Sequence, residues 1–98
     1  MIARTLTVDV GSDRLDDVVR SYRELVRPIH EGATGLLTHL VLINRSAGRI
    51  AFVGVWESDE SVSAVADALE PARERLWASF GRAPGLDLFE VVDHIGVD

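Results

Sequence analysis

The sequence contains no cysteine, its ten basic side chains are all arginine, and only six of its 98 residues are aromatic. Without cysteine there is no disulfide, no thiolate nucleophile and no cysteine-ligated zinc or iron–sulfur site. Without lysine there is no Schiff base and no lysine-dependent phosphate loop. With thiol and amine nucleophiles excluded, we expect any chemistry to fall to histidine, carboxylates and hydrogen-bonding aromatic side chains.

The charge balance is acidic, with sixteen Asp and Glu and a formal net charge of −6. Because the chain has no excess of positive charge, we expect no nucleic-acid or anionic-membrane partner. No apolar run approaches the roughly 18 residues of a membrane span, and no apolar signal segment follows Met1. With 47% hydrophobic residues the chain should fold. We expect a single cytoplasmic domain over residues 1–98.

Four segments have the alternating or continuous apolar pattern that is typical of strands. The second and third are separated by a short polar segment containing Gly48, which favours a hairpin. The four predicted strands are Ile2–Val10, Leu36–Asn44, Ile50–Trp56 and Leu86–Ile95.

Two segments have apolar residues at helical spacing. The first follows Ser12, a plausible N-cap, and should end or kink near Val26 or Arg27 because Pro28 lacks a backbone N–H. The second begins at Ser58 or Asp59. Pro71 lies inside it, which predicts two helical pieces with the proline in the first turn of the second.

The predicted order is β-α-β-β-α-β, which is the ferredoxin-like α+β layout with both helices on one face of a four-stranded antiparallel sheet. The two central strands are apolar on both faces, and the helices can cover only one. A second copy packed sheet to sheet is the simplest cover, so we expect a homodimer.

With this layout the sequence resembles the antibiotic biosynthesis monooxygenase-like (ABM) group of the dimeric α+β barrel superfamily. The resemblance is carried by Ile2–Val10, by Val55–Glu60 with its Trp-Glu-Ser-acid-acid run, and by Leu88–Val92. It implies a dimer with a small-molecule pocket between sheet and helices in each subunit. The group includes cofactor-free oxygenases of aromatic polyketides, haem-degrading enzymes, isomerases and proteins without an assigned activity.

The haem-degrading branch of that group carries a Trp and a haem-ligating His nine and nineteen residues after the Trp of the run. Counted from Trp56, those positions hold Val65 and Arg75. Neither matches, so we expect no haem and no other cofactor.

Five residues are candidates for a ligand site. A neutral imidazole at His39 could act as a general base, and the alternative is a half-buried histidine that is simply hydrogen-bonded. Trp56, which the resemblance also indicates, could wall a pocket or cover the sheet edge, while Trp77 and Tyr22 lie in helical stripes that are more often core. Arg4 could hold an anionic substrate, although a cross-strand ion pair with Glu90 or Asp93 is the simpler interpretation.

Neither His94 with Asp93 nor His30 with Glu31 can close a metal site, because each pair offers one histidine and one acid. We therefore expect no metal.

Two functions remain open. One is a cofactor-independent monooxygenase or tailoring enzyme that acts on an aromatic or polyketide-like compound, with His39 as base. The other is a non-catalytic dimeric module that binds a small hydrophobic molecule or a partner. The enzyme requires a helix-to-sheet cavity above roughly 300 Å³.

Overall fold

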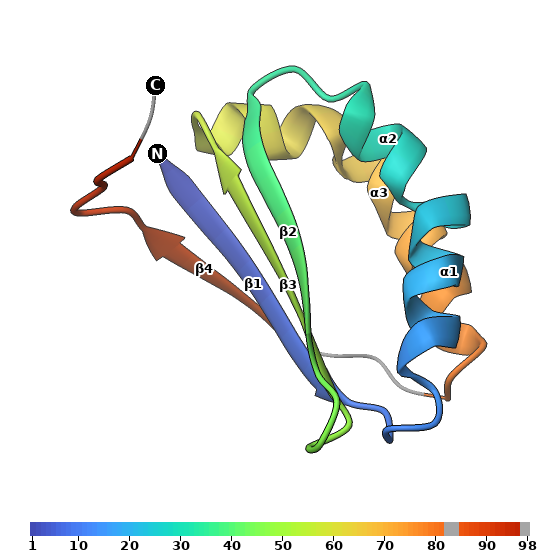
Figure 1. Ribbon diagram of the computed structural model, residues 1–98. Helices are drawn as coiled ribbons and strands as arrows, with labels where there is room; N and C mark the ends of the chain where they lie inside the picture. Colours follow the sequence, from blue (N-terminus) through green and yellow to red (C-terminus); the bar gives the residue numbers. More distant parts are fainter. Residues whose placement is uncertain (82–84, 97–98) are drawn as a thin grey trace.

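The computed structural model describes residues 1–81 and 85–96 and consists of one antiparallel sheet with helices along one face (Figure 1). The strands lie in the order β2-β3-β1-β4. This is the predicted ferredoxin-like α+β fold. The elements are β1 (Ile2–Asp9), α1 (Leu15–Leu25), α2 (Arg27–Glu31), β2 (Leu36–Asn44), β3 (Arg49–Trp56), α3 (Asp59–Ala78) and β4 (Leu86–Glu90).

The core lies between the sheet and the helices. On β3 the alternate residues Ile50, Phe52 and Trp56 are almost fully buried on the helix side, as period-two alternation requires. The helices add their apolar stripes to this layer. The buried helix residues are Leu15, Val18 and Tyr22 of α1, and Leu69, Ala72, Leu76 and Trp77 of α3.

The two helix starts differ in how they are capped. At α3 the predicted cap is confirmed, since the Ser58 side chain accepts a hydrogen bond from the Ser61 amide. At α1 the prediction is wrong. The helix begins after Arg14, and the Ser12 hydroxyl instead donates to the Arg45 carbonyl, 2.7 Å away, which ties this loop to the β2–β3 hairpin.

The prolines act in different ways. The break predicted at Pro28 is confirmed, because α1 ends at Leu25 and Pro28 lies in the first turn of α2. The break predicted at Pro71 is wrong, since α3 runs without interruption through this residue. Buried Leu69 and Ala72 flank Pro71, so packing against the core holds the helix together across the missing N–H.

Two details of the sheet also differ from the prediction. The last strand ends at Glu90 instead of Ile95. On β2 a bulge between Leu36 and Thr38 interrupts the continuous strand expected over Leu36–Asn44, and Leu37 beside it is exposed. From Thr38 to Asn44 the pairing with β3 is regular. Alternation along this stretch places His39 on the helix side together with Val41 and Ile43.

The opposite face of the sheet has no cover among the described residues. Leu40 and Leu42 of β2 are about half exposed there, as is Phe89 of β4. Their pairing partners Val53 and Ala51 lie on the same face of β3. The predicted apolar second face is thus present in this chain.

None of the helices in the described part of the chain combines the length and apolar character needed to cross a membrane.

Candidate functional site

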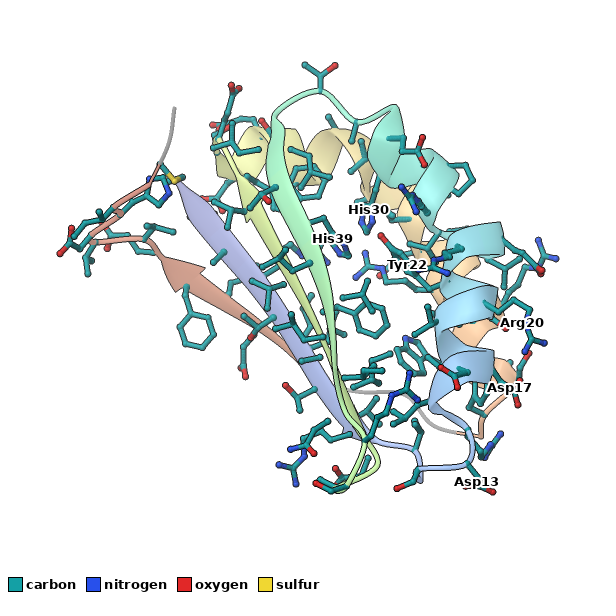
Figure 2. The ribbon with its side chains drawn as sticks, viewed as in Figure 1. Asp13, Asp17, Arg20, Tyr22, His30 and His39 are labelled. Atoms are coloured by element: carbon teal, nitrogen blue, oxygen red, sulfur yellow. The ribbon has the colours of Figure 1, made fainter. Side chains whose placement is uncertain are left out.

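Three side chains from three elements meet where the helices face β2 (Figure 2). The Tyr22 hydroxyl, from α1, lies 2.9 Å from Nδ1 of His30 on α2 and 3.0 Å from Nδ1 of His39 on β2. The rings of Tyr22 and His39 are stacked, with centroids 5.4 Å apart and planes 8° apart. The two imidazole centroids are 4.2 Å apart. We call this group the His-Tyr-His cluster.

Local features of the chain bring the cluster together. The break at Pro28 starts the short helix α2, which places His30 beside Tyr22 instead of further along the α1 axis. His39 pairs with Gly54 in the regular part of β2, so strand alternation turns it toward the helices. A straight α1 would not hold His30 in this position.

The hydrogen bonds of the cluster constrain its protons. A phenol has one O–H to donate, while its oxygen can also accept. Tyr22 can therefore donate to one Nδ1 and accept from the Nδ1–H of the other ring. This arrangement uses the phenolic proton inside the cluster and places the two neutral histidines in opposite tautomers.

The environment keeps these groups uncharged at neutral pH. Burial lowers the pKa of His39 to about 4. Burial, followed by the charges of His39, Arg73 and Arg4, lowers the pKa of His30 to about 4 as well. Burial raises the pKa of Tyr22 to about 12. The cluster is thus a chain of three neutral groups that can each donate or accept a proton.

An inner cavity lies on the core side of the cluster, with a volume of about 40 Å³. It exceeds the roughly 10–15 Å³ that one water molecule needs, but it is far below the size of an aromatic ligand. The cluster forms one wall, and Trp56 and Trp77 form others. The remaining lining residues are Arg4, Leu6, Val26, Phe52, Gly54, Arg73 and Leu76.

Glycine at position 54 gives this cavity its floor. A Cβ added there would lie 3.1 Å from Nε1 of Trp56 and 3.4 Å from Cδ2 of His39. A glycine inside a strand often marks a place where another group approaches the backbone closely. Because Cδ2 is bonded to Nε2, the edge of the His39 ring that does not contact Tyr22 is turned toward this floor.

Two arginines line the same cavity, Arg4 from β1 and Arg73 from α3. The Nε atom of each is buried and has no hydrogen-bond partner within the described residues. Burial is the main cause that lowers the pKa of both guanidinium groups, and the charge of Arg73 lowers that of Arg4 further. The ion pair predicted between Arg4 and Glu90 or Asp93 is absent from residues 1–81 and 85–96.

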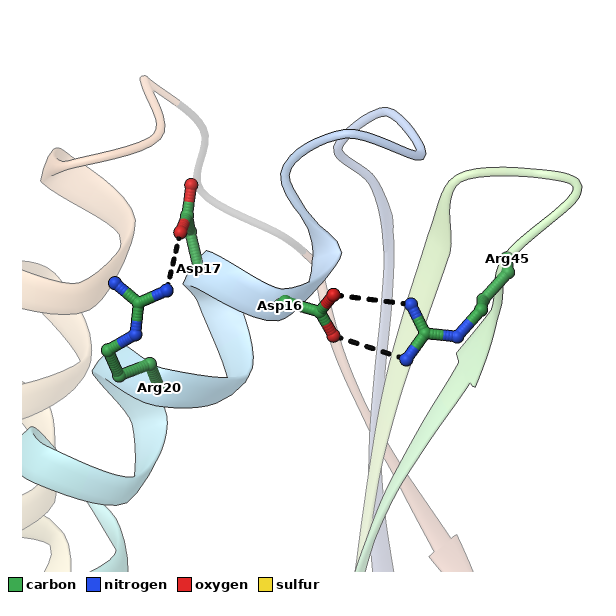
Figure 3. Close-up of polar contacts among 4 residues, drawn as sticks. All are labelled: Asp16, Asp17, Arg20 and Arg45. Atoms are coloured by element: carbon green, nitrogen blue, oxygen red, sulfur yellow. Dashed lines mark hydrogen bonds and ion pairs between the residues drawn. The ribbon is translucent and has the colours of Figure 1, made fainter.

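An outer groove of about 580 Å³ lies on the other side of the cluster, between α1, α2 and β2. All three cluster residues line it as well as the inner cavity. At its rim the Arg45 guanidinium donates to both carboxylate oxygens of Asp16, at 3.2 and 3.4 Å (Figure 3). This contact lowers the pKa of Asp16. The groove is large enough for a small organic ligand, whereas the inner cavity is not.

The five residues selected from the sequence all lie around the inner cavity. They are Arg4, Tyr22, His39, Trp56 and Trp77. Trp56 is 1% exposed and therefore belongs to the core instead of covering the sheet edge. Sequence reasoning missed His30 and Arg73. The sequence signal that could have identified His30 is Pro28, two residues before it. Pro28 predicted the helix break after which α2 places His30 beside Tyr22.

Among the described residues, no group of three or more His, Asp or Glu side chains could hold a metal ion.

Comparison with known proteins places the fold. No family model matches the chain. It is 28% identical over 89 residues to the uncharacterized proteins MT2634 and Rv2557 of two Mycobacterium tuberculosis strains. Those residues are 91% of this chain but only 40% of each relative, so the chain spans less than half the length of the curated relatives that it matches.

Solved structures with the same fold include a monooxygenase from the gene ActVA-Orf6 of Streptomyces coelicolor, in complex with nanaomycin D. Its TM-score is 0.79 at 15% identity, covering 99% of this chain and 92% of that one. A dimeric ferredoxin-like protein from an uncultured marine organism has a TM-score of 0.77 at 18% identity, covering 99% and 92%. An antibiotic biosynthesis monooxygenase has a TM-score of 0.70 at 18% identity, covering 95% and 100%. The resemblance to the ABM group is confirmed at the level of the fold.

Proposed function

We propose that the chain is one subunit of a homodimer that binds a small aromatic, polyketide-like molecule at the His-Tyr-His cluster and oxidises it without a cofactor. The observation that carries this proposal is the cluster itself. It places two neutral imidazoles, bridged by a phenol, between a ligand-sized groove and a cavity lined by two arginines. The fold shared with monooxygenases supports the reaction class.

His39 is the base in this proposal. We assign its Nδ1–H as the donor to the Tyr22 oxygen, 3.0 Å away, and the Tyr22 hydroxyl as the donor to Nδ1 of His30, 2.9 Å away. This arrangement leaves Nε2 of His39 unprotonated and able to accept a proton, next to the Cδ2 atom that faces Gly54. Tyr22 and His30 fix the tautomer of the base, so both are positioning residues.

The reaction can be written with every atom accounted for. A substrate C–H proton moves to Nε2 of His39, and the substrate keeps the electron pair as an enolate. The enolate carbon forms a C–O bond with O₂, which is reduced to a peroxide and takes the proton back. Loss of water then breaks the O–O bond and leaves a carbonyl, so that one CH₂ and one O₂ give one C=O and one H₂O.

The low pKa of His39 sets a condition on this step. A base whose conjugate acid has a pKa of about 4 accepts a proton readily only if the resulting anion is stabilised. The guanidinium groups of Arg4 and Arg73 supply positive charge in the same cavity. They would stabilise the enolate as it forms.

A second function, binding without catalysis, is favoured by one observation. The inner cavity of about 40 Å³ is below the roughly 300 Å³ expected for an enzyme pocket, whereas the outer groove of about 580 Å³ is above that size. A ligand confined to the groove would contact the cluster without reaching the arginines.

The test begins with a thermal-shift screen of two- and three-ring phenols together with nanaomycin D, followed by oxygen-uptake assays on each compound that binds. We expect oxygen uptake that His39→Ala lowers at least about 100-fold, as for a general base. His94→Ala is the matched control, because His94 is exposed and lies outside both pockets.

The tautomers give a test that needs no substrate. Nitrogen-15 NMR of the histidine rings should show a proton on Nδ1 of His39 and on Nε2 of His30. The reverse assignment would exclude His39 as the base at Nε2. Binding without oxygen uptake would favour the non-catalytic function.

A further inference from the structure

The inner cavity has an electrostatic character that the net charge of the chain does not suggest. The chain carries a formal charge of −6, yet the twelve residues that line the cavity include two arginines and no Asp or Glu. Two half-buried guanidinium groups without a carboxylate between them repel each other. Such an arrangement is stabilised when an anion binds between them.

From this geometry we infer that the cavity formed by Arg4 and Arg73 binds the anionic group of the ligand, a carboxylate or an enolate oxygen. The inference rests on the proposed ligand-binding function and names the class of ligand, an aromatic acid.

The position of the two arginines supports this assignment. Arg4 is on the helix-facing side of β1, directly opposite Gly54 of β3, whose missing side chain leaves room in front of the guanidinium. Arg73 reaches the same space from α3. Donors from two elements thus converge, and their buried Nε atoms have no partner in the described parts of the chain.

The size of the cavity is consistent with a small group. A volume of about 40 Å³ accommodates a few water molecules or a carboxylate, but no aromatic ring. The ring system of the ligand must therefore lie outside it. Leu88 of β4, which pairs with Arg4 and lies on the same face of the sheet, is 56% exposed and offers an apolar surface beside Arg4.

Glu70 is the nearest candidate for an internal counter-ion. Its charge partly offsets the lowering of the pKa of both arginines. It is exposed, however, and forms no ion pair with either arginine in the described structure. It leaves the buried Nε atoms available for a ligand.

The experiment compares two probes of the same shape, 1-naphthoate and 1-naphthamide, which differ in charge. Trp56 and Trp77, the two tryptophans of the chain, both line the cavity, so intrinsic fluorescence reports binding directly. We expect naphthoate to bind at least about tenfold more tightly than naphthamide, since charge-assisted hydrogen bonds are about twice as strong as neutral ones.

Arg73→Gln should remove this preference, and Arg73→Lys should restore part of it. Arg75→Gln is the matched control, because Arg75 is an exposed arginine on the same helix that does not line the cavity. It makes the same change in net charge and should keep the preference for naphthoate.

Equal affinity for the two probes, no binding of either at millimolar concentration, or an equal loss in Arg75→Gln would overturn the inference. The comparison in the unmodified protein decides it even if Arg73→Gln fails to fold. A preference for naphthoate without oxygen uptake from any compound would leave the anion site standing and remove the oxygenase. Oxygen uptake from uncharged compounds, with no preference for naphthoate, would leave the oxygenase standing and remove the anion site.

Discussion

The two histidines of the cluster link folding to pH. Their pKa values are about 4 in the folded chain, against 6.5 for an unperturbed histidine. Between these values the unfolded chain binds more protons than the folded chain. The free energy of unfolding therefore falls as the pH is lowered through this window, and the stabilisation is complete above about pH 6.5.

We expect the urea midpoint of unfolding to fall between pH 7 and pH 5, where most carboxylates remain ionised. A variant with both His30→Gln and His39→Gln should show a flatter dependence over the same range. His94→Gln should retain the dependence of the parent protein, since His94 is exposed in the C-terminal segment. A midpoint that does not change from pH 7 to pH 5 would contradict the assignment.

At the residue scale, the candidate site residues could be selected from the sequence, but their positions relative to one another could not. Tyr22, His39, Trp56, Trp77 and Arg4 could be selected because each is an unusual polar or aromatic residue in an apolar pattern. Their common cavity could not be derived, since it depends on how α1, α2 and β2 pack. His30 could not be selected, because its contacts with Tyr22 and His39 join residues that are distant in the sequence, and its neighbour Glu31 suggests only an incomplete metal pair.

At the element scale, tertiary packing overrode one strong local signal. A proline in a helix interior removes one backbone hydrogen bond and clashes with the preceding turn. Pro28 ended α1 as predicted, while Pro71 lies within a continuous α3. The two prolines differ in the burial of the residues on their C-terminal side. Beyond Pro71 the buried residues Leu76 and Trp77 continue the apolar stripe, whereas α2 contributes no buried residue.

The cost of that proline can be measured. Pro71 is exposed, so Pro71→Ala should lose no core contact and should restore the missing backbone hydrogen bond. We expect the free energy of unfolding to rise by about 1–3 kcal/mol, the upper value being the full helix-interior penalty and the lower allowing for the greater freedom of the unfolded chain. Urea denaturation measures it.

Glu74→Ala, at an exposed position of the same helix, provides the control and should change the free energy by only a few tenths of a kcal/mol. A loss of stability in Pro71→Ala would mean that the proline ring contributes packing or that its rigidity outweighs the lost hydrogen bond.

At the scale of the whole molecule, the sheet has one covered face and one apolar face that is exposed in the single chain. The sequence predicted both, because alternation on β2 and β3 placed apolar residues on either side. It could not predict the bulge in β2 between Leu36 and Thr38. A stable interface buries roughly 800 Å² on each partner, and the face of a four-stranded sheet offers an area of that order.

The predicted homodimer follows from this face and is tested by sedimentation velocity. We expect a dimer at micromolar concentration, and we expect Leu40→Arg to shift it to the monomer, because burying an unpaired guanidinium costs several kcal/mol. Leu40 is 49% exposed in the isolated chain, so the monomer of this variant should remain folded. Ala68→Arg, which adds the same charge at an exposed site on α3, should stay dimeric. A parent protein that sediments as a monomer would leave the exposed leucines of β2 without an explanation and would remove the dimer from the proposed function.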